Sequence, residues 1–185
     1  MKKFILASGS PRRKEILLRE GYSFEIVTSD KEDAFDKNCP AEKFSVRCAL
    51  SKARDVYSRV PKTSVVLGAD TVVYFGGKII GKPKDEKEAK RYLQMLSGKT
   101  HTVVTGYAVL SANKRVIGHD VSHVTFNVLP GSLINDYVAT GKPLDKAGAY
   151  GLQDGFDLVS RYEGSYWNIV GLPIERIEKE LKNFK

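Results

Sequence analysis

The chain has 185 residues, of which 42% are hydrophobic, and this supports one domain with a substantial core. No run of 18 apolar residues occurs, which predicts no membrane-spanning helix, and the only two cysteines lack metal-ligand spacing, which favours a reduced, cytoplasmic setting. The net charge of +8 is spread along the chain and indicates a polyanionic partner, with small phosphorylated ligands favoured over nucleic acid.

The first predicted element is a buried strand from Phe4 to Leu6 that stops at three small residues. Ser10 as N-cap, Pro11 at the first helical position and Gly21 beyond the end predict a helix directly after it. Helix N-termini attract anions, and this first turn also carries three cations. They are Arg12, Arg13 and Lys14. A bound phosphate would relieve their mutual repulsion, although a solvated basic helix start fits the same residues equally well.

A short strand from Phe24 to Val27 comes next, followed by a polar loop that contains Glu32 and Asp33. These carboxylates are the hard oxygen ligands that magnesium prefers, although such a loop is usually only solvated. Apolar residues at helical spacing between Pro40 and Val60 predict a long amphipathic helix, and Lys52 on it is a candidate phosphate contact.

Asp70 follows the apolar strand from Val65 to Leu67, on what we expect to be a sharp Gly-Ala turn. A carboxylate at a strand end can hold a divalent cation or accept a proton from water. The alternative is that Asp70 only caps the turn by accepting from nearby N–H groups.

The second half of the chain mixes strands and helices without strict alternation, which favours an α/β or α+β fold with a mixed sheet. Gly76-Gly77 between two apolar runs predicts a hairpin, and Asp85 is expected to cap a helix that reaches Leu96 and ends at Gly98. Two long strands, a short helix, a glycine-rich segment and a terminal helix are expected to follow. Their predicted ranges are 102–110, 116–128, 133–140, 141–155 and the residues after Pro173.

Two further patterns are decoys. Residues 76–82 fit the opening of a phosphate-binding P-loop, but Pro83 replaces the Ser or Thr that would hold magnesium, and the segment lies on a predicted hairpin. His119 and His123 fall in a predicted strand, where four residues separate them by roughly 13 Å, too far to share a metal.

Six short motifs, in order along the chain, resemble those of the Maf family, nucleotide pyrophosphatases first described as inhibitors of septum formation. They are Ser8-Gly9-Ser10-Pro11-Arg12-Arg13, Gly68-Ala69-Asp70-Thr71, Gly81-Lys82-Pro83, Leu96-Ser97-Gly98-Lys99-Thr100-His101, Asp145-Lys146-Ala147-Gly148-Ala149-Tyr150-Gly151, and Gly164-Ser165-Tyr166 with Val170-Gly171-Leu172-Pro173. The resemblance covers nearly the whole chain.

The resemblance implies a single domain over residues 1–185 with a two-lobed α/β fold, a twisted mixed β-sheet flanked by helices and a nucleotide cleft between the lobes, similar to inosine triphosphate pyrophosphatases. It also implies metal-dependent hydrolysis of dTTP and UTP to the monophosphate and pyrophosphate. The implied roles fall on ten positions: Asp70 as proton acceptor; Ser8, Arg13, Lys52 and Lys82 at phosphate; Arg12, Thr71 and Gln153 in specificity; and Asp70 with Glu32 or Asp33 at Mg²⁺ or Mn²⁺. Which of Glu32 and Asp33 reaches the metal stays open, as does whether the chain forms a homodimer.

The residues agree with these roles. Cations from three segments suit a triphosphate, and Gln153 matches the N3–H and O4 of uracil or thymine. Arg12, which can only donate, would meet the amino group of cytosine donor to donor, so we expect UTP and dTTP to be preferred over CTP. The alternatives are a nucleic-acid-binding regulator of cell division without catalysis, and a phosphomonoesterase or kinase-like enzyme.

Overall fold

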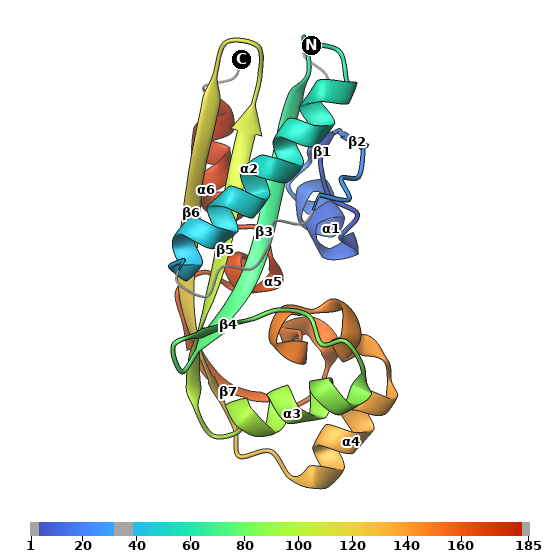
Figure 1. Ribbon diagram of the computed structural model, residues 1–185, viewed down its shortest axis with the longest axis vertical. Helices are drawn as coiled ribbons and strands as arrows, with labels where there is room; N and C mark the ends of the chain where they lie inside the picture. Colours follow the sequence, from blue (N-terminus) through green and yellow to red (C-terminus); the bar gives the residue numbers. More distant parts are fainter. Residues whose placement is uncertain (1–3, 32–38, 183–185) are drawn as a thin grey trace. The chain divides into compact units, whose positions relative to one another are not determined.

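The computed structural model describes residues 4–31 and 39–182. Its strands form a seven-stranded sheet in the order β2-β1-β3-β5-β6-β7, with β4 paired to β3 (Figure 1). By its internal contacts the chain divides into two compact units. The first comprises Met1–Thr71, Val104–Asp120 and Ser165–Lys185, and the second comprises Val72–Val103 and Val121–Gly164.

Most helices and strands lie wholly within one or the other of the two units. The first unit holds β1 (Phe4–Leu6), α1 (Pro11–Arg19), β2 (Glu25–Ile26), α2 (Ala41–Arg59), α5 (Tyr166–Val170) and α6 (Ile174–Leu181). The second holds β4 (Lys78–Ile80), α3 (Glu86–Leu96), α4 (Gly131–Ala139), the 3-10 helices η1 (Lys142–Asp145), η2 (Ala147–Ala149) and η3 (Leu152–Asp154), and β7 (Val159–Glu163). Three long strands contribute to both: β3 (Val65–Phe75), β5 (Thr100–Leu110) and β6 (Arg115–Phe126). These elements confirm the expected mixed α/β fold.

The sheet of the first unit has an apolar core on each face. Strand β1 runs parallel to both β2 and β3, and its successive side chains alternate between the faces. Ile5 packs with Ala49, Ala53 and Val56 of α2, whereas Leu6 belongs to a separate cluster with residues of α1 and α6. Helix α2 therefore covers one face, and α1 and α6 cover the other (Figure 1).

The predicted turn at Asp70 is wrong, because β3 continues through it from Val65 to Phe75. Gly68 is needed for close packing and not for a turn. A Cβ at this position would lie 2.3 Å from the Ala49 carbonyl oxygen and 2.9 Å from the Ala53 Cβ, both on α2. The glycine thus lets the helix backbone approach the strand, and Asp70 lies inside the sheet instead of at a strand end.

Helix α1 begins at Pro11 as predicted, and Gly21 beyond its end has φ of 75°. Ser10 occupies the N-cap position, but its side chain makes no capping hydrogen bond, which corrects the expected capping role. Its backbone N–H instead donates to the Ser8 hydroxyl, 3.2 Å away.

The second unit confirms the local predictions made for it. Gly76 and Gly77 have φ of 57° and 78°, as the tight turn between β3 and β4 requires. The Asp85 carboxylate accepts from the Glu88 N–H at 2.7 Å and caps α3, which packs against α4 and η2. The two long strands and α4 form with small shifts at their ends, and the glycine-rich segment forms the three short 3-10 helices.

Among the described residues, no helix is both long and apolar enough to cross a membrane.

Candidate functional site

An ion pair between Asp70 of β3 and Lys52 of α2 forms one part of the candidate site. The Lys52 ammonium lies 2.5 Å from Asp70 Oδ1, and the two side chains are 21% and 17% exposed, so both remain accessible to a ligand. Asp70 Oδ2 has no hydrogen-bond partner among the described residues. The carboxylate is therefore held by one oxygen and can act through the other.

Arg13, on the first turn of α1, is held by three hydrogen bonds. Its Nε donates to the Gly171 carbonyl at 2.8 Å, Nη1 to the Ser8 hydroxyl at 2.9 Å and Nη2 to the Thr71 hydroxyl at 3.2 Å. A guanidinium has five N–H groups, so one on each terminal nitrogen has no partner among the described residues. Two such donors match two oxygens of a phosphate group.

The surroundings of Arg13 shift its pKa in opposite directions. Burial lowers the pKa of Arg13 to about 10, the Asp70 carboxylate raises it, and the neighbouring Arg12 lowers it further. Arg13 thus stays cationic at neutral pH within electrostatic reach of both Asp70 and Arg12. A partly desolvated cation of this kind binds an anion more strongly than a fully solvated one does.

Ser8 is a buried hydroxyl whose lone pairs are both in use. It accepts from the Ser10 N–H at 3.2 Å and from Arg13 Nη1 at 2.9 Å. Because a hydroxyl has two lone pairs and one hydrogen, the Ser8 hydrogen is left to donate to a ligand. Ser8, the start of α1 and Arg13 therefore present several donors in one place, as an anion-binding site requires.

The predicted residues Lys82 and Gln153 belong to the second unit and are exposed there. Lys82 comes soon after β4, and Gln153 lies in η3. A buried cluster holds η3. The Tyr137 hydroxyl donates to Asp154 Oδ2 at 2.5 Å and accepts from the Gly151 N–H at 3.0 Å, while the Lys146 ammonium lies 3.2 Å from Asp154 Oδ2. These contacts hold Gly151 and Asp154, the residues between which Gln153 lies in the sequence.

The residues fit a metal ion in part. Among residues 4–31 and 39–182, no three His, Cys, Asp or Glu side chains gather to hold one. Mg²⁺ does not need such a group, because it is commonly held by one or two carboxylates, water and substrate phosphates. The unengaged Oδ2 of Asp70 suits that arrangement. The predicted partners Glu32 and Asp33 lie outside the described residues.

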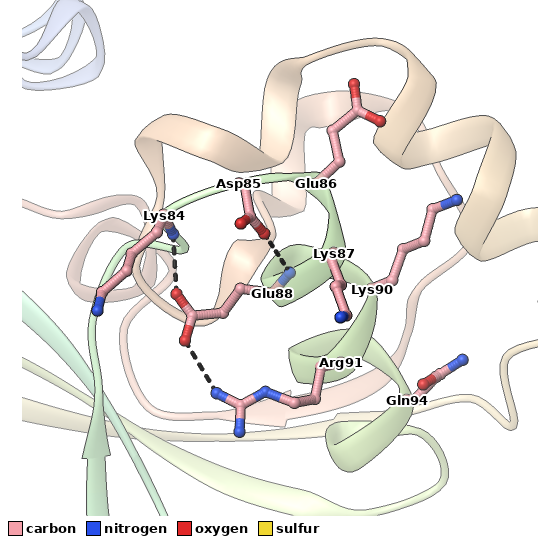
Figure 2. Close-up of a pocket in the computed structure, with 8 residues that line it drawn as sticks. All are labelled: Lys84, Asp85, Glu86, Lys87, Glu88, Lys90, Arg91 and Gln94. Atoms are coloured by element: carbon pink, nitrogen blue, oxygen red, sulfur yellow. Dashed lines mark hydrogen bonds and ion pairs between the residues drawn. The ribbon is translucent and has the colours of Figure 1, made fainter.

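A hollow of about 770 Å³ along the start of α3 contains none of the predicted site residues. Figure 2 shows Glu88 there between the Lys84 backbone N–H and the Arg91 guanidinium, both at 2.9 Å. Arg91 pairs with Glu88, and the hollow follows the outer surface of one helix without any of the predicted site residues.

Sequence reasoning missed the residues that support Arg13 from behind. The Gly171 carbonyl accepts a hydrogen bond from Arg13. Thr105 hydrogen-bonds to Thr71 through its hydroxyl group and also to the Asn168 carbonyl. Thr105 and Asn168 are fully buried. Gly171 lies in one of the recognised motifs, but in the sequence no spacing or pattern joins these positions to residue 13.

Comparison with known proteins finds similar sequences over almost the whole chain and a similar fold. The sequence model of the family described as Maf-like protein matches residues 3–184. Over 100% of the chain and 96% of the relative, the sequence is 48% identical to a dTTP/UTP pyrophosphatase of Bacillus cytotoxicus. A dTTP/UTP pyrophosphatase of Alkaliphilus oremlandii is 44% identical over 99% of the chain and 96% of its own length. The solved Ham1 protein of Staphylococcus aureus has the same fold, with a TM-score of 0.53 and 9% identity over all of both chains.

Proposed function

Because this chain belongs to the Maf family, we propose that it is a nucleoside triphosphate pyrophosphatase that hydrolyses dTTP and UTP to the monophosphate and pyrophosphate. One observation carries the proposal: an ion-paired carboxylate with an unengaged oxygen lies within electrostatic reach of an arginine that has two N–H groups to spare. Relatives that are 44–48% identical over 99–100% of the chain are dTTP/UTP pyrophosphatases, which supports this substrate class.

The phosphate-binding residues of the proposal are Ser8, Arg13, Lys52 and Lys82. Arg13 offers two N–H groups to two phosphate oxygens, and Ser8 offers its hydroxyl hydrogen. Lys52 uses one of its three ammonium hydrogens on Asp70, so the other two can bind phosphate. A triphosphate carries about four negative charges, which these cations offset during binding.

In the proposed reaction, a water molecule attacks the α-phosphorus and the Asp70 carboxylate accepts its proton. The bond between the α-phosphorus and the bridging oxygen breaks, and pyrophosphate leaves with its charge offset by the lysines and Arg13. A divalent cation, Mg²⁺ or Mn²⁺, held by Asp70 with Glu32 or Asp33, would lower the pKa of a bound water and offset phosphate charge. The Lys52 ion pair keeps Asp70 oriented throughout.

Base selection belongs to Arg12 and Gln153 in this proposal, and the resemblance adds Thr71 to the set. Gln153 pairs with N3–H and O4 of uracil or thymine, and Arg12 would meet the amino group of cytosine donor to donor. An unpaired buried donor costs about 1–3 kcal/mol, so UTP should be preferred over CTP by about 5- to 150-fold. A cytoplasmic setting completes the proposal, supported by the two cysteines, Cys39 and Cys48, neither of which forms a disulfide.

The test is a panel of dTTP, UTP, dCTP, CTP and purine triphosphates with Mg²⁺ or Mn²⁺, in which pyrophosphate and orthophosphate are assayed separately. We expect pyrophosphate and the monophosphate, with dTTP and UTP turned over fastest. Orthophosphate with a diphosphate product would refute the reaction. Binding to DNA or RNA that weakens steeply with salt, without any turnover, would favour a nucleic-acid regulator instead. Equal efficiency on UTP and CTP would refute only the base-selection part.

A further inference from the structure

A continuous chain of hydrogen bonds runs from the Arg13 guanidinium into the interior of the first unit. Arg13 Nη2 donates to Thr71 Oγ1, which lies 2.9 Å from Thr105 Oγ1. Thr105 Oγ1 in turn donates to the Asn168 backbone carbonyl at 2.8 Å. The chain thus joins α1 to β3, β5 and α5, and each residue in it comes from a different segment.

Counting hydrogens fixes the direction of every bond in this chain. A carbonyl can only accept, so the single hydroxyl hydrogen of Thr105 is used on Asn168. Thr105 must therefore accept from Thr71, and the only other acceptor recorded for the Thr71 hydroxyl hydrogen among the described residues is the Gly171 carbonyl, at the longer distance of 3.5 Å. Because Thr71 also accepts from Arg13, it has at most one lone pair left and no hydrogen to offer a ligand.

The inner end of the chain is rigid and sealed from solvent. Thr105 and Asn168 are both fully buried. The Asn168 side-chain oxygen accepts from the Thr105 N–H at 3.2 Å, and the Asn168 N–H donates to the Ser165 hydroxyl at 3.2 Å. Neither side chain can touch a bound nucleotide, so any influence on binding must pass through Thr71 and Arg13.

The same region also holds Arg13 from its other edge. Arg13 Nε donates to the carbonyl of Gly171, which follows α5 with φ of 119°. A Cβ on Gly171 would lie 3.2 Å from Thr71 Oγ1, so the glycine allows the turn and the threonine to approach closely. With Nε and one hydrogen of each terminal nitrogen engaged, the guanidinium plane is fixed and its two remaining N–H groups have set directions.

We propose that Thr71, Thr105 and Asn168 form a positioning chain that aims the two remaining N–H groups of Arg13 at a substrate phosphate. Through Arg13, Thr71 then governs affinity for the triphosphate whichever base it carries. The inference rests on the proposed function, in which Arg13 binds phosphate. It adds Thr105 and Asn168 as positioning residues and gives Thr71 a role different from the one the resemblance implies.

Binding of inorganic tripolyphosphate, which has phosphates but no base, tests this directly. Thr71→Val keeps the shape of the side chain but removes the hydroxyl, so we expect about tenfold weaker binding by calorimetry, from one lost hydrogen bond to a charged group. Thr71→Ser keeps the hydroxyl and should restore binding to within about twofold of wild type. In steady-state assays of Thr71→Val, KM for UTP and for CTP should rise by the same factor while kcat changes little.

Thr105→Val, with Thr105→Ser as its matched control, extends the test to a residue that no ligand can reach. Removing the Thr105 hydroxyl takes away the nearer acceptor of the Thr71 hydrogen, so we expect tripolyphosphate binding about threefold weaker in the valine variant only, since Arg13 keeps its direct contacts. Circular dichroism establishes that each variant is folded before binding is measured.

The outcomes separate the two proposals. If the wild type neither binds tripolyphosphate nor hydrolyses nucleotides, the proposed function is wrong. If the wild type binds but Thr71→Val binds equally well, or if Thr71→Val loses its preference for UTP over CTP at unchanged tripolyphosphate affinity, the positioning chain is wrong and Thr71 acts elsewhere.

Discussion

At the scale of single residues, the candidate site depends on how each polar atom divides its hydrogen bonds. Asp70 gives one carboxylate oxygen to Lys52 and keeps the other. The Ser8 hydroxyl accepts two hydrogen bonds and keeps its hydrogen, whereas the Thr71 hydroxyl donates its hydrogen to Thr105. Ser8 therefore faces a ligand as a donor, and Thr71 does not. The distinction between these two hydroxyls comes from counting hydrogens, not from their exposure.

Replacing Asp70 with asparagine should abolish turnover and leave the fold intact. The amide has nearly the same shape, but it cannot accept a proton from water and it binds a cation poorly. We expect kcat to fall by at least about 100-fold, as for other losses of a group that acts in the transition state. Steady-state kinetics with UTP measures the fall.

Asp55→Asn is the matched control, because Asp55 also forms an ion pair, with Arg59 at 2.7 Å on the outer part of α2. It should keep wild-type turnover. If Asp70→Asn keeps a large share of activity as well, Asp70 only supports the structure around Lys52.

At the scale of elements, the site depends on the close approach of α2 to β3. Lys52 reaches Asp70 because Gly68 leaves the helix backbone room to lie against the strand. Gly68→Ala would place a methyl group 2.3 Å from the Ala49 carbonyl oxygen, which is backbone and cannot swing aside. We expect a loss of about 3 kcal/mol in the free energy of unfolding, measured by urea denaturation.

A second glycine provides the comparison. Gly131 begins α4 with open space around its Cβ position, so Gly131→Ala should be neutral or slightly stabilising. Equal stability of Gly68→Ala and Gly131→Ala would mean that α2 can move away from the sheet without cost.

Local signals allowed most elements to be predicted from the sequence. Gly76-Gly77 and the Asp85 cap act on residues a few positions away, so their effect can be recognised in a short stretch of sequence. Gly68 could not be interpreted in this way, because the backbone that requires it belongs to α2, in another segment. The predicted turn failed for that reason, and the role of Asp70 stays a prediction.

The members of the candidate site that could be predicted are those named by charge or by the resemblance, including the uncharged Ser8 and Thr71. Asp70, Arg13 and Lys52 were found from charge and from the resemblance, and the structure places them in one unit. Thr105 and Asn168 are uncharged and buried, and their partners lie far away in sequence. The assigned roles of the site residues stay predictions, as do the single domain and the expected cleft.

At the scale of the whole molecule, stability should depend on pH through His101. This ring is buried in the second unit, where it packs edge-on against Phe126 and Tyr150 and its Nε2 lies 2.7 Å from the Tyr150 hydroxyl. Its Nδ1 has no partner among the described residues. Burial lowers the pKa of His101 from 6.5 to about 4, so the ring is neutral in the folded protein at neutral pH.

Acid should therefore favour unfolding, because the unfolded chain takes up the proton more readily than the folded one. The contribution of neutral His101 to the free energy of unfolding is fully present above pH 6.5 and is lost as the pH falls toward about 4. A pKa difference of this size lowers the free energy of unfolding by about 3 kcal/mol at the acid end of this pH range. Urea denaturation between pH 7 and pH 4 measures the slope.

His101→Gln should flatten that slope, whereas His123→Gln, at an exposed position of β6, should leave it unchanged. The difference in slope is decisive, because carboxylates that titrate in the same range contribute equally to all three proteins. An unchanged slope in His101→Gln would show that His101 is not the group responsible.

The first unit is built from three separate segments of the chain, so its internal hydrogen bonds can be complete only after the last of them has been translated. All ten residues that the sequence predicts for the site, from Ser8 to Gln153, have been synthesised before Gly171 is added. Until then Arg13 lacks the carbonyl that holds its Nε, and Thr105 lacks Asn168. A chain released early would carry every recognisable site residue and still be unable to fix the arginine. The hydrogen bonds that hold Arg13 can therefore be completed only with the last segment, which begins at Ser165.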